Sequence, residues 1–262
     1  MKSLIFTDID GTLINDQHVV TPKTKEAIKK RIEAGDLFIP VSARMPEAIN
    51  VVADTISSNY PMIAYNGAML LDENNEIIES HSFPVDDILE IISLVTQKYP
   101  NVAWNVYAGH QWFSPKMPGN IQEEQIVKVT STKANISDIE KLPSCHKALL
   151  IGDAKEIDAL QTQLREEFPD LSIVKSNATL LEIMAKGINK GKALLAMKNH
   201  YGVPLENTWA FGDNFNDEQM LQEAGNSVAM GNAPDEVKKS AKIITKTNNE
   251  DGIAEVLNKY FD

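Results

Sequence analysis

A strand, a helix and a second strand follow one another at the start of the chain, and this order constrains the fold more than any other feature. The apolar run Leu4–Phe6 predicts a buried strand, and Leu37–Val41 predicts another. Thr21 suits the N-cap of the helix between them, and Gly35 suits its C-terminal end. Two strands joined by a helix run parallel in one sheet, so we expect an α/β fold. Pro40 favours an edge strand or a bulge for the second run, because proline donates no hydrogen bond to a neighbouring strand.

The same alternation of strands and helices covers both ends of the chain and is interrupted in the middle. It continues to Tyr65, where a hairpin is predicted around the Asp72–Asn75 turn, and it returns from Ile188 onward. Residues 84–183 mix helices with hairpins, which is typical of an α+β module. We therefore expect a doubly wound, mostly parallel, Rossmann-like core over residues 1–83 and 184–262, with an inserted α+β cap over residues 84–183.

Composition narrows the classes of partner. The hydrophobic content of 43% is that of a globular protein, and no apolar run is long enough to span a bilayer. The net charge of −12 argues against nucleic acid or an anionic membrane as partner, but it leaves room for a small anionic substrate. The chain starts without signal-peptide architecture and has a single cysteine, Cys145, so we expect a cytoplasmic protein. The oligomeric state is not indicated.

Acidic residues follow two of the predicted strands at the point where each strand ends. Asp8 and Asp10 end the first strand, and Asp213 and Asp217 lie in the Gly212–Asp217 turn after another apolar run. Each turn alone could be an ordinary acidic surface turn. The carboxyl ends of strands in a doubly wound sheet meet at one crevice, however, and carboxylates there need a cation to offset their desolvation. Asp8 and Asp10, with Asp213 or Asp217, form a ligand set that suits Mg²⁺.

Two further residues fit a phosphate at the same edge. Ser42 ends the second strand and offers a hydroxyl, and Lys190 begins a predicted helix, where its charge can meet an anion. Without the acidic turns, Lys190 would be read as a solvated helix-end lysine. A carboxylate nucleophile, a metal, a hydroxyl and a lysine together predict phosphoryl transfer.

These residues resemble the four motifs of the haloacid dehalogenase superfamily. The matching segments are Asp8–Thr12, Ser42, Lys190 and Gly212–Asp217. More narrowly, the chain is similar to the Cof-type phosphatases of that superfamily, which carry a cap inserted between the second and third motifs. Asn66-Gly67-Ala68 and Met230-Gly231-Asn232-Ala233 also match segments common in that subfamily.

The resemblance implies a role for each catalytic residue. Asp8 would be the nucleophile that forms an aspartyl-phosphate, and Asp10 would protonate the leaving alcohol and then activate water. Lys190 would bridge Asp8 and the phosphate. Thr12 and Ser42 would hold the phosphoryl oxygens.

The resemblance also implies the metal ligands and further substrate contacts. Mg²⁺ would be bound by the Asp8 carboxylate, the Asp10 backbone carbonyl and Asp213, with Asp217 in support. Asn216 would contact the phosphate or position the metal loop. We expect Arg44, which lies near the crevice, to form a structural ion pair, with a contact to the substrate as the alternative.

The sequence thus predicts a Mg²⁺-dependent phosphatase of small phosphorylated metabolites, with sugar phosphates suggested by family analogy. A phosphomutase using the same aspartyl-phosphate and a non-catalytic sugar-phosphate sensor are the alternatives. The cap would set specificity, although its residues carry no recognisable code for a substrate. Cys145 and His146 are not expected to form a nucleophilic pair, because neighbours in a strand point to opposite faces.

Overall fold

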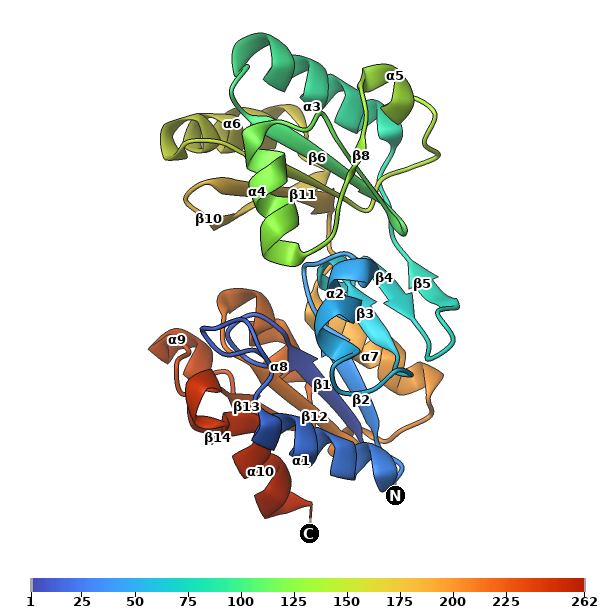
Figure 1. Ribbon diagram of the computed structural model, residues 1–262, viewed down its shortest axis with the longest axis vertical. Coiled ribbons are helices and arrows are strands. Elements are labelled where there is room, and N and C mark those ends of the chain that lie inside the picture. The colour runs from blue at the N-terminus through green and yellow to red at the C-terminus, as the bar shows by residue number, and fades with distance from the viewer. Residues whose placement is uncertain (1, 262) are drawn as a thin grey trace. The chain divides into compact units, whose positions relative to one another are not determined.

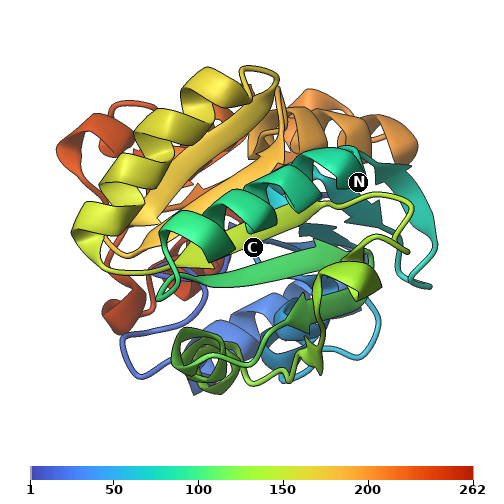
Figure 2. The same cartoon turned by 90° about the horizontal axis from the view of Figure 1, so that it is seen from above.

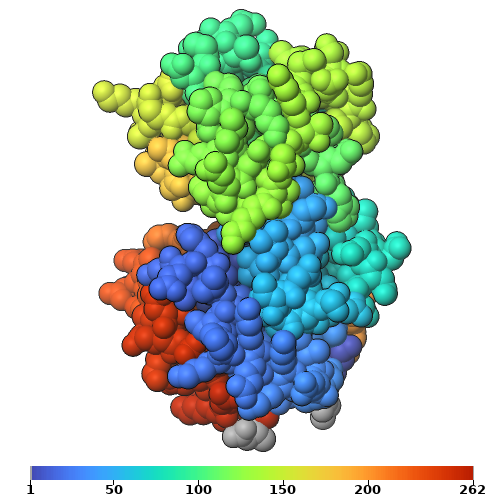
Figure 3. Space-filling model, viewed as in Figure 1, coloured from blue at the N-terminus to red at the C-terminus, as the bar shows by residue number. Residues whose placement is uncertain are grey.

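The computed structural model describes residues 2–261. The chain divides into two compact units: unit 1 comprises Met1–Ser80 and Asn189–Asp262, and unit 2 comprises His81–Ile188. In Figure 3 the N-terminal residues, in blue, and the C-terminal residues, in orange and red, both belong to unit 1. Within the described range, no helix has both the length and the apolar composition needed to cross a membrane.

Unit 1 is built on one mixed sheet (Figure 1). Its strands are β1 (Leu4–Asp8), β2 (Leu37–Val41), β3 (Met62–Ala64), β4 (Met69–Leu71), β5 (Ile77–Ser80), β12 (Thr208–Gly212), β13 (Asn226–Ala229) and β14 (Ile243–Ile244). They lie in the order β14-β13-β12-β1-β2-β3-β4-β5. The strands from β14 to β3 are parallel, and β4 and β5 add an antiparallel hairpin. The predicted mostly parallel α/β core is therefore confirmed.

Helices cover both faces of this sheet. They are α1 (Pro22–Glu33), α2 (Pro46–Ala53), α7 (Lys190–His200), α8 (Glu218–Glu223), α9 (Asp235–Lys238) and α10 (Gly252–Tyr260), with short 3-10 turns η1 (Tyr65–Gly67), η2 (Leu205–Asn207), η3 (Phe215–Asp217) and η4 (Asn248–Glu250). Leu4 and Phe6 belong to the core cluster that α7 and α8 complete. Trp209, level with Ile5, contacts Tyr260 of α10 on the other face. Successive strand residues alternate between faces, so Asp8 points to the α7 side with Leu4 and Phe6.

The expectation that Pro40 marks an edge or a bulge is wrong, because β2 lies between β1 and β3. The Ser42 N–H donates to the Ile63 carbonyl at 2.9 Å, so Pro40, two residues earlier, faces the same neighbour opposite Pro61. Pro61 precedes β3, which begins at Met62. The position opposite Pro40 thus lies before β3 begins, so the lack of an N–H on Pro40 removes no hydrogen bond from the paired part of the two strands.

Unit 2 has its own sheet and core. Its strands are β6 (Ala103–Ala108), β7 (Gln111–Ser114), β8 (Thr132–Lys133), β9 (Lys147–Ile151), β10 (Leu171–Asn177) and β11 (Leu180–Ala185), in the order β10-β11-β9-β6-β7-β8. Its helices are α3 (Val85–Lys98), α4 (Pro118–Val127), α5 (Ile136–Ile139) and α6 (Ala154–Glu167). Figure 2 shows α3 and α6 lying across one face of the sheet, where Ile92 and Leu160 join Trp104 and Val106 in one apolar cluster.

Helix α4 was not predicted. It buries Asn120 and Val127 but exposes Ile121 and Ile126, so the sequence lacks the apolar periodicity that marks a helix. The Asn120 amide instead donates to the Trp104 carbonyl at 2.9 Å and to Asn105 Oδ1 at 3.0 Å. The hydrogen bonds of the buried Asn120 therefore attach this helix to β6, a task that a stripe of apolar side chains usually performs.

Candidate active site

A buried lysine joins the two acidic turns of unit 1. Lys190 is the first residue of α7, and its side chain is 0% exposed. Its Nζ donates to Asp8 Oδ1 at 2.5 Å and to Asp217 Oδ1 at 2.6 Å. The solvated-lysine reading is therefore wrong. Asp8 can receive this bond because its position in β1 turns it toward the face that α7 covers.

Asp217 organises the second turn with both of its carboxylate oxygens. Oδ2 accepts the N–H groups of Asp213 at 2.9 Å and Asn214 at 3.0 Å, while Oδ1 accepts from Lys190. A Cβ on Gly212 would lie 2.5 Å from the Asp217 Cβ, so only glycine fits where β12 ends. Asp217 thus closes the turn and shares the charge of Lys190.

Asp213, in the second acidic turn, contacts residues of the first acidic turn through its carboxylate. Thr12 donates its hydroxyl to Asp213 Oδ1 at 2.7 Å, and Asn232 Nδ2 lies 3.3 Å from Asp213 Oδ2. Gly11 has a φ of +83°, and a Cβ there would collide with the Asp213 carboxylate. Among residues 2–261, Asp213 forms no ion pair within 4.0 Å.

The electrostatics show an excess of negative charge at this cluster. Burial raises the pKa of Asp8 well above its usual value, and Asp217, Asp213 and Asp10 raise it further against the opposing effect of Lys190. Burial and the nearby Asp217 raise the pKa of Asp213 to about 6. Burial alone would lower the pKa of Lys190, but the two carboxylates that it contacts outweigh this and raise the pKa. One ammonium therefore faces several carboxylates, and a further cation would relieve their repulsion.

The donor set fits a divalent metal ion. Asp8, Asp213 and Asp217 each offer a carboxylate oxygen, and these atoms lie within 4.8 Å of one another. Carboxylate oxygens are hard ligands of the kind that Mg²⁺ prefers. Asp217 accepts three hydrogen bonds, two of them on Oδ2, whereas Asp8 accepts one and Asp213 accepts one on each oxygen, so Asp8 and Asp213 are better placed as direct ligands.

The Asp10 carboxylate is not part of that group. Arg44 holds it with two bonds, from Nε to Oδ2 at 2.9 Å and from Nη2 to Oδ1 at 2.6 Å. The Asp10 side chain is still 52% exposed, whereas that of Arg44 is 12% exposed. Arg44 is therefore ion-paired, as expected, and the Asp10 side chain stays open to a substrate.

The two remaining sequence candidates are linked by a residue that was not among them. Ser42 follows Val41, the register partner of Asp8, so it lies at the same edge of the sheet. The Asn66 N–H donates to the Ser42 carbonyl at 2.8 Å, and Asn216 Nδ2 donates to Asn66 Oδ1 at 3.3 Å. Asn66 has a φ of 53°, which suits the Asn66-Gly67 turn that the sequence marks as a subfamily segment but not as part of the site.

The cysteine and the neighbouring histidine of unit 2 form no nucleophilic pair. Burial raises the pKa of the Cys145 thiol to about 12, which leaves almost no thiolate at neutral pH. His146 Nδ1 accepts the Gly109 N–H at 2.9 Å, so this nitrogen is already engaged.

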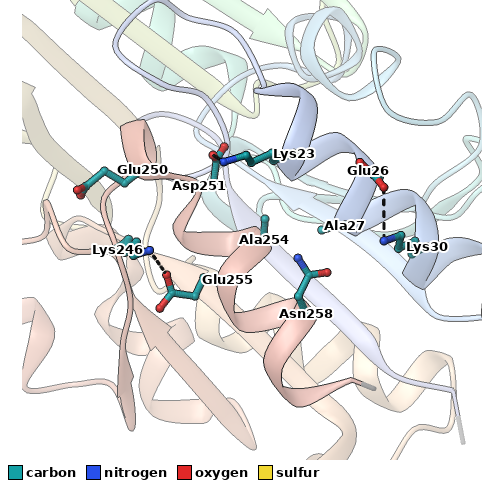
Figure 4. A pocket seen from close by; sticks show the side chains of 10 residues that line it. All are labelled: Lys23, Glu26, Ala27, Lys30, Lys246, Glu250, Asp251, Ala254, Glu255 and Asn258. Atoms are coloured by element: carbon teal, nitrogen blue, oxygen red, sulfur yellow. Dashed lines mark ion pairs between the residues drawn. The ribbon is translucent and has the colours of Figure 1, made fainter.

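A cavity of about 320 Å³ lies away from the acidic cluster, between α1 and α10 (Figure 4). Its charged side chains pair with one another, as Lys246 does with Glu255 at 2.7 Å and Lys30 with Glu26 at 3.4 Å. Ala27 and Ala254 also line it. The acidic cluster differs because its carboxylates surround one buried ammonium, so we take it as the candidate site.

Comparison with known proteins gives consistent results. The sequence matches the family model of the haloacid dehalogenase-like hydrolases over residues 5–257. It is 38% identical over 264 residues to a Haemophilus influenzae protein named "Putative phosphatase", covering 100% of this chain and 99% of that protein. It is 31% identical over 257 residues to a 5-amino-6-(5-phospho-D-ribitylamino)uracil phosphatase of Bacillus subtilis, covering 97% and 94%. A crystal structure from Thermotoga maritima superposes with a TM-score of 0.88 at 31% identity, covering 99% and 97%.

Proposed function

The chain belongs to the haloacid dehalogenase-like hydrolases, and from this premise we propose that it is a Mg²⁺-dependent phosphatase of small phosphorylated metabolites. The observation that carries the proposal is the buried Asp8–Lys190–Asp217 cluster with Asp213 beside it. The full-length relatives named as phosphatases support the class of enzyme, a phosphoric monoester hydrolase.

Asp8 is the proposed nucleophile. Lys190 holds Oδ1 of its carboxylate, and no other hydrogen bond to that carboxylate is present among the described residues. Oδ2 is therefore the oxygen that would attack phosphorus and form the aspartyl-phosphate. Lys190 would orient the carboxylate during attack and balance its charge.

Asp10 is the proposed acid and base. Its exposed carboxyl group, in the protonated form, would give its proton to the oxygen of the leaving alcohol, and the resulting carboxylate would then take a proton from the water that cleaves the aspartyl-phosphate. Arg44 would keep this carboxylate aimed through its two bonds. The same side chain thus moves the proton in both half-reactions.

The phosphoryl oxygens would be held by Ser42, Asn216 and Thr12. Asp8, Asp213 and the Asp10 carbonyl would bind Mg²⁺, with Asp217 in support. When bound, the metal would act as a Lewis acid that offsets charge on the phosphoryl oxygens. The Thr12 hydroxyl donates to Asp213, so this residue also contributes to orienting a metal ligand.

Unit 2 is the proposed cap that sets substrate specificity. The sequence suggests sugar phosphates, whereas the Bacillus subtilis relative is named for a ribityl phosphate that carries a uracil ring. We therefore propose a phosphate ester of a small polyol or of a polyol-bearing heterocycle as the substrate class.

A phosphate-release panel tests this function. Sugar, nucleotide, cofactor and ribitylaminouracil phosphates are each assayed with Mg²⁺ and with excess EDTA. Wild type should turn over repeatedly with Mg²⁺ and stop in EDTA. Asp8→Asn should lose nearly all kcat, whereas Asp170→Asn, the same change at an exposed turn of unit 2, should not. Transfer to substrate without net phosphate release would indicate a phosphomutase, and ligand binding without any turnover would indicate a sensor.

A further inference from the structure

Asn232 contacts both acidic turns, and it was not among the predicted site residues. Its Nδ2 donates to the Gly11 carbonyl at 2.9 Å and lies 3.3 Å from Asp213 Oδ2. Its Oδ1 accepts the Asn248 N–H at 3.0 Å. Because a backbone N–H can only donate, the oxygen of the amide must face Asn248 and the nitrogen must face the two acceptors.

The loop that carries Asn232 is held in place on both sides. The Met230 N–H donates to the Gly212 carbonyl at 3.0 Å, directly before Asp213. The Gly231 N–H donates to the Lys246 carbonyl at 3.0 Å. A Cβ on Gly231 would lie 2.9 Å from the Thr247 nitrogen, so the backbone approaches closely there. The Asn232 amide is therefore presented to Asp213 from a fixed backbone.

We propose that Asn232 is a positioning residue of the metal site, an inference that rests on the proposed function. With Thr12 on Oδ1 and Asn232 on Oδ2, each oxygen of Asp213 has one donor from the protein. A carboxylate oxygen accepts in more than one direction, so each keeps a lone pair for a cation. These donors restrict the orientation of the carboxylate, one oxygen of which lies within 4.8 Å of a carboxylate oxygen of Asp8, and donors of this kind raise metal affinity.

A purely structural role for Asn232 predicts a different outcome. Asn249 lies in η4 and anchors the loop after β1. Its Nδ2 donates to Asp16 Oδ2 at 2.9 Å, and its Oδ1 accepts the Asp16 N–H at 3.1 Å. It has no hydrogen bond to Asp213 among the described residues. Asn249→Ala is therefore the matched control for loop anchoring without contact to the metal ligand.

The test is direct Mg²⁺ binding by isothermal titration calorimetry, without substrate, on wild type and on Asn232→Ala, Asn232→Ser, Asn249→Ala and Asp213→Asn. We expect Asn232→Ala to bind Mg²⁺ about 10- to 100-fold more weakly with an unchanged circular dichroism spectrum. Asn249→Ala should bind like wild type. If Asn232→Ala does not fold, Asn232→Ser, which shortens the side chain but keeps it polar, should show a loss in the same direction.

Three results would overturn the inference, and they separate it from the proposed function. Wild-type affinity in a folded Asn232 variant would overturn the positioning role alone. An equal loss in Asn249→Ala would show that loop anchoring, and not the orientation of Asp213, controls the affinity. No Mg²⁺ binding by wild type would remove the metal site itself and, with it, both proposals.

Discussion

Replacing Lys190 by methionine should destabilise unit 1 more than any loss of packing explains. Methionine keeps a long side chain in the space but removes an ammonium that is 0% exposed and that bonds Asp8 at 2.5 Å and Asp217 at 2.6 Å. Removing one partner of a buried ion pair costs about 3–5 kcal/mol, because the other charge is left buried without compensation. We expect a loss in this range in EDTA at about pH 8, together with loss of activity.

The loss should shrink as the pH falls. The pKa of Asp8 is already raised by burial, and removing Lys190 raises it further. A carboxyl group whose folded pKa exceeds the unfolded value binds more protons in the folded state, so it lowers stability as the pH rises. At pH values above the folded pKa of Asp8, each additional unit by which that pKa is raised lowers the free energy of unfolding by about 1.4 kcal/mol. This stability is recovered as the pH falls below that pKa.

Urea unfolding followed by circular dichroism measures the loss, and hydrogen exchange of β1 peptides assigns it to unit 1. Lys29→Met is the control, since it removes a lysine from an exposed position of α1. Lys190→Met with Asp217→Asn should cost less than the sum of the single variants, because the double variant also removes one of the stranded charges. If Lys190→Met and Lys29→Met differ by less than about 0.5 kcal/mol, the assignment of Lys190 as the buried counter-ion is refuted.

Three further predictions rest on other features of unit 1. Mg²⁺ affinity should fall about fourfold or more between about pH 7.5 and about pH 5.5 in calorimetric titrations, because Asp213, with a pKa of about 6, must be ionised to bind; a flat profile would contradict this. Thr7→Val should raise the urea midpoint by an amount worth about 1 kcal/mol, since the buried Thr7 hydroxyl finds no hydrogen-bond partner within residues 2–261; a lower midpoint would mean that the hydroxyl is satisfied. Gly11→Ala should unfold at less urea than Gly35→Ala and bind Mg²⁺ more weakly, because both glycines have positive φ but only Gly11 would place its Cβ against Asp213; equal midpoints would count against the packing of the two turns.

The parts of the site that could be predicted follow from local pattern and sheet topology. Asp8 and Lys190 are 182 positions apart in sequence, yet their meeting follows from two rules. Parallel strands bring their carboxyl ends to one edge, and alternation along β1 turns Asp8 to the side of a helix start. The glycines before or after each carboxylate mark the turns that the chain must make there.

The parts that could not be predicted depend on tertiary contacts that leave no periodic trace. Asn232 approaches Gly11 from 221 residues away, and the match of Met230-Gly231-Asn232-Ala233 to a subfamily segment does not say which residues the Asn232 amide contacts. The pairing of Arg44 with Asp10 required knowledge of where the loop after β2 turns. Helix α4 was missed because a buried asparagine anchors it in place of an apolar stripe. In each case the role of a polar side chain depends on a hydrogen-bond partner that is distant in sequence, and the neighbouring residues do not reveal that partner.

During turnover, Asp8 is the residue proposed to carry the phosphoryl group. The most direct measurement is mass spectrometry of the Asp10→Asn variant after mixing with p-nitrophenyl phosphate and Mg²⁺. This substrate needs little protonation of its leaving group, whereas hydrolysis of the aspartyl-phosphate still needs the base, so the intermediate should accumulate. We predict one added phosphoryl group on the peptide that contains Asp8, and none when Asp8→Asn is combined with Asp10→Asn. A phosphoryl group on another residue, or phosphate release from the Asp8→Asn variant at the wild-type rate, would show that Asp8 is not the nucleophile.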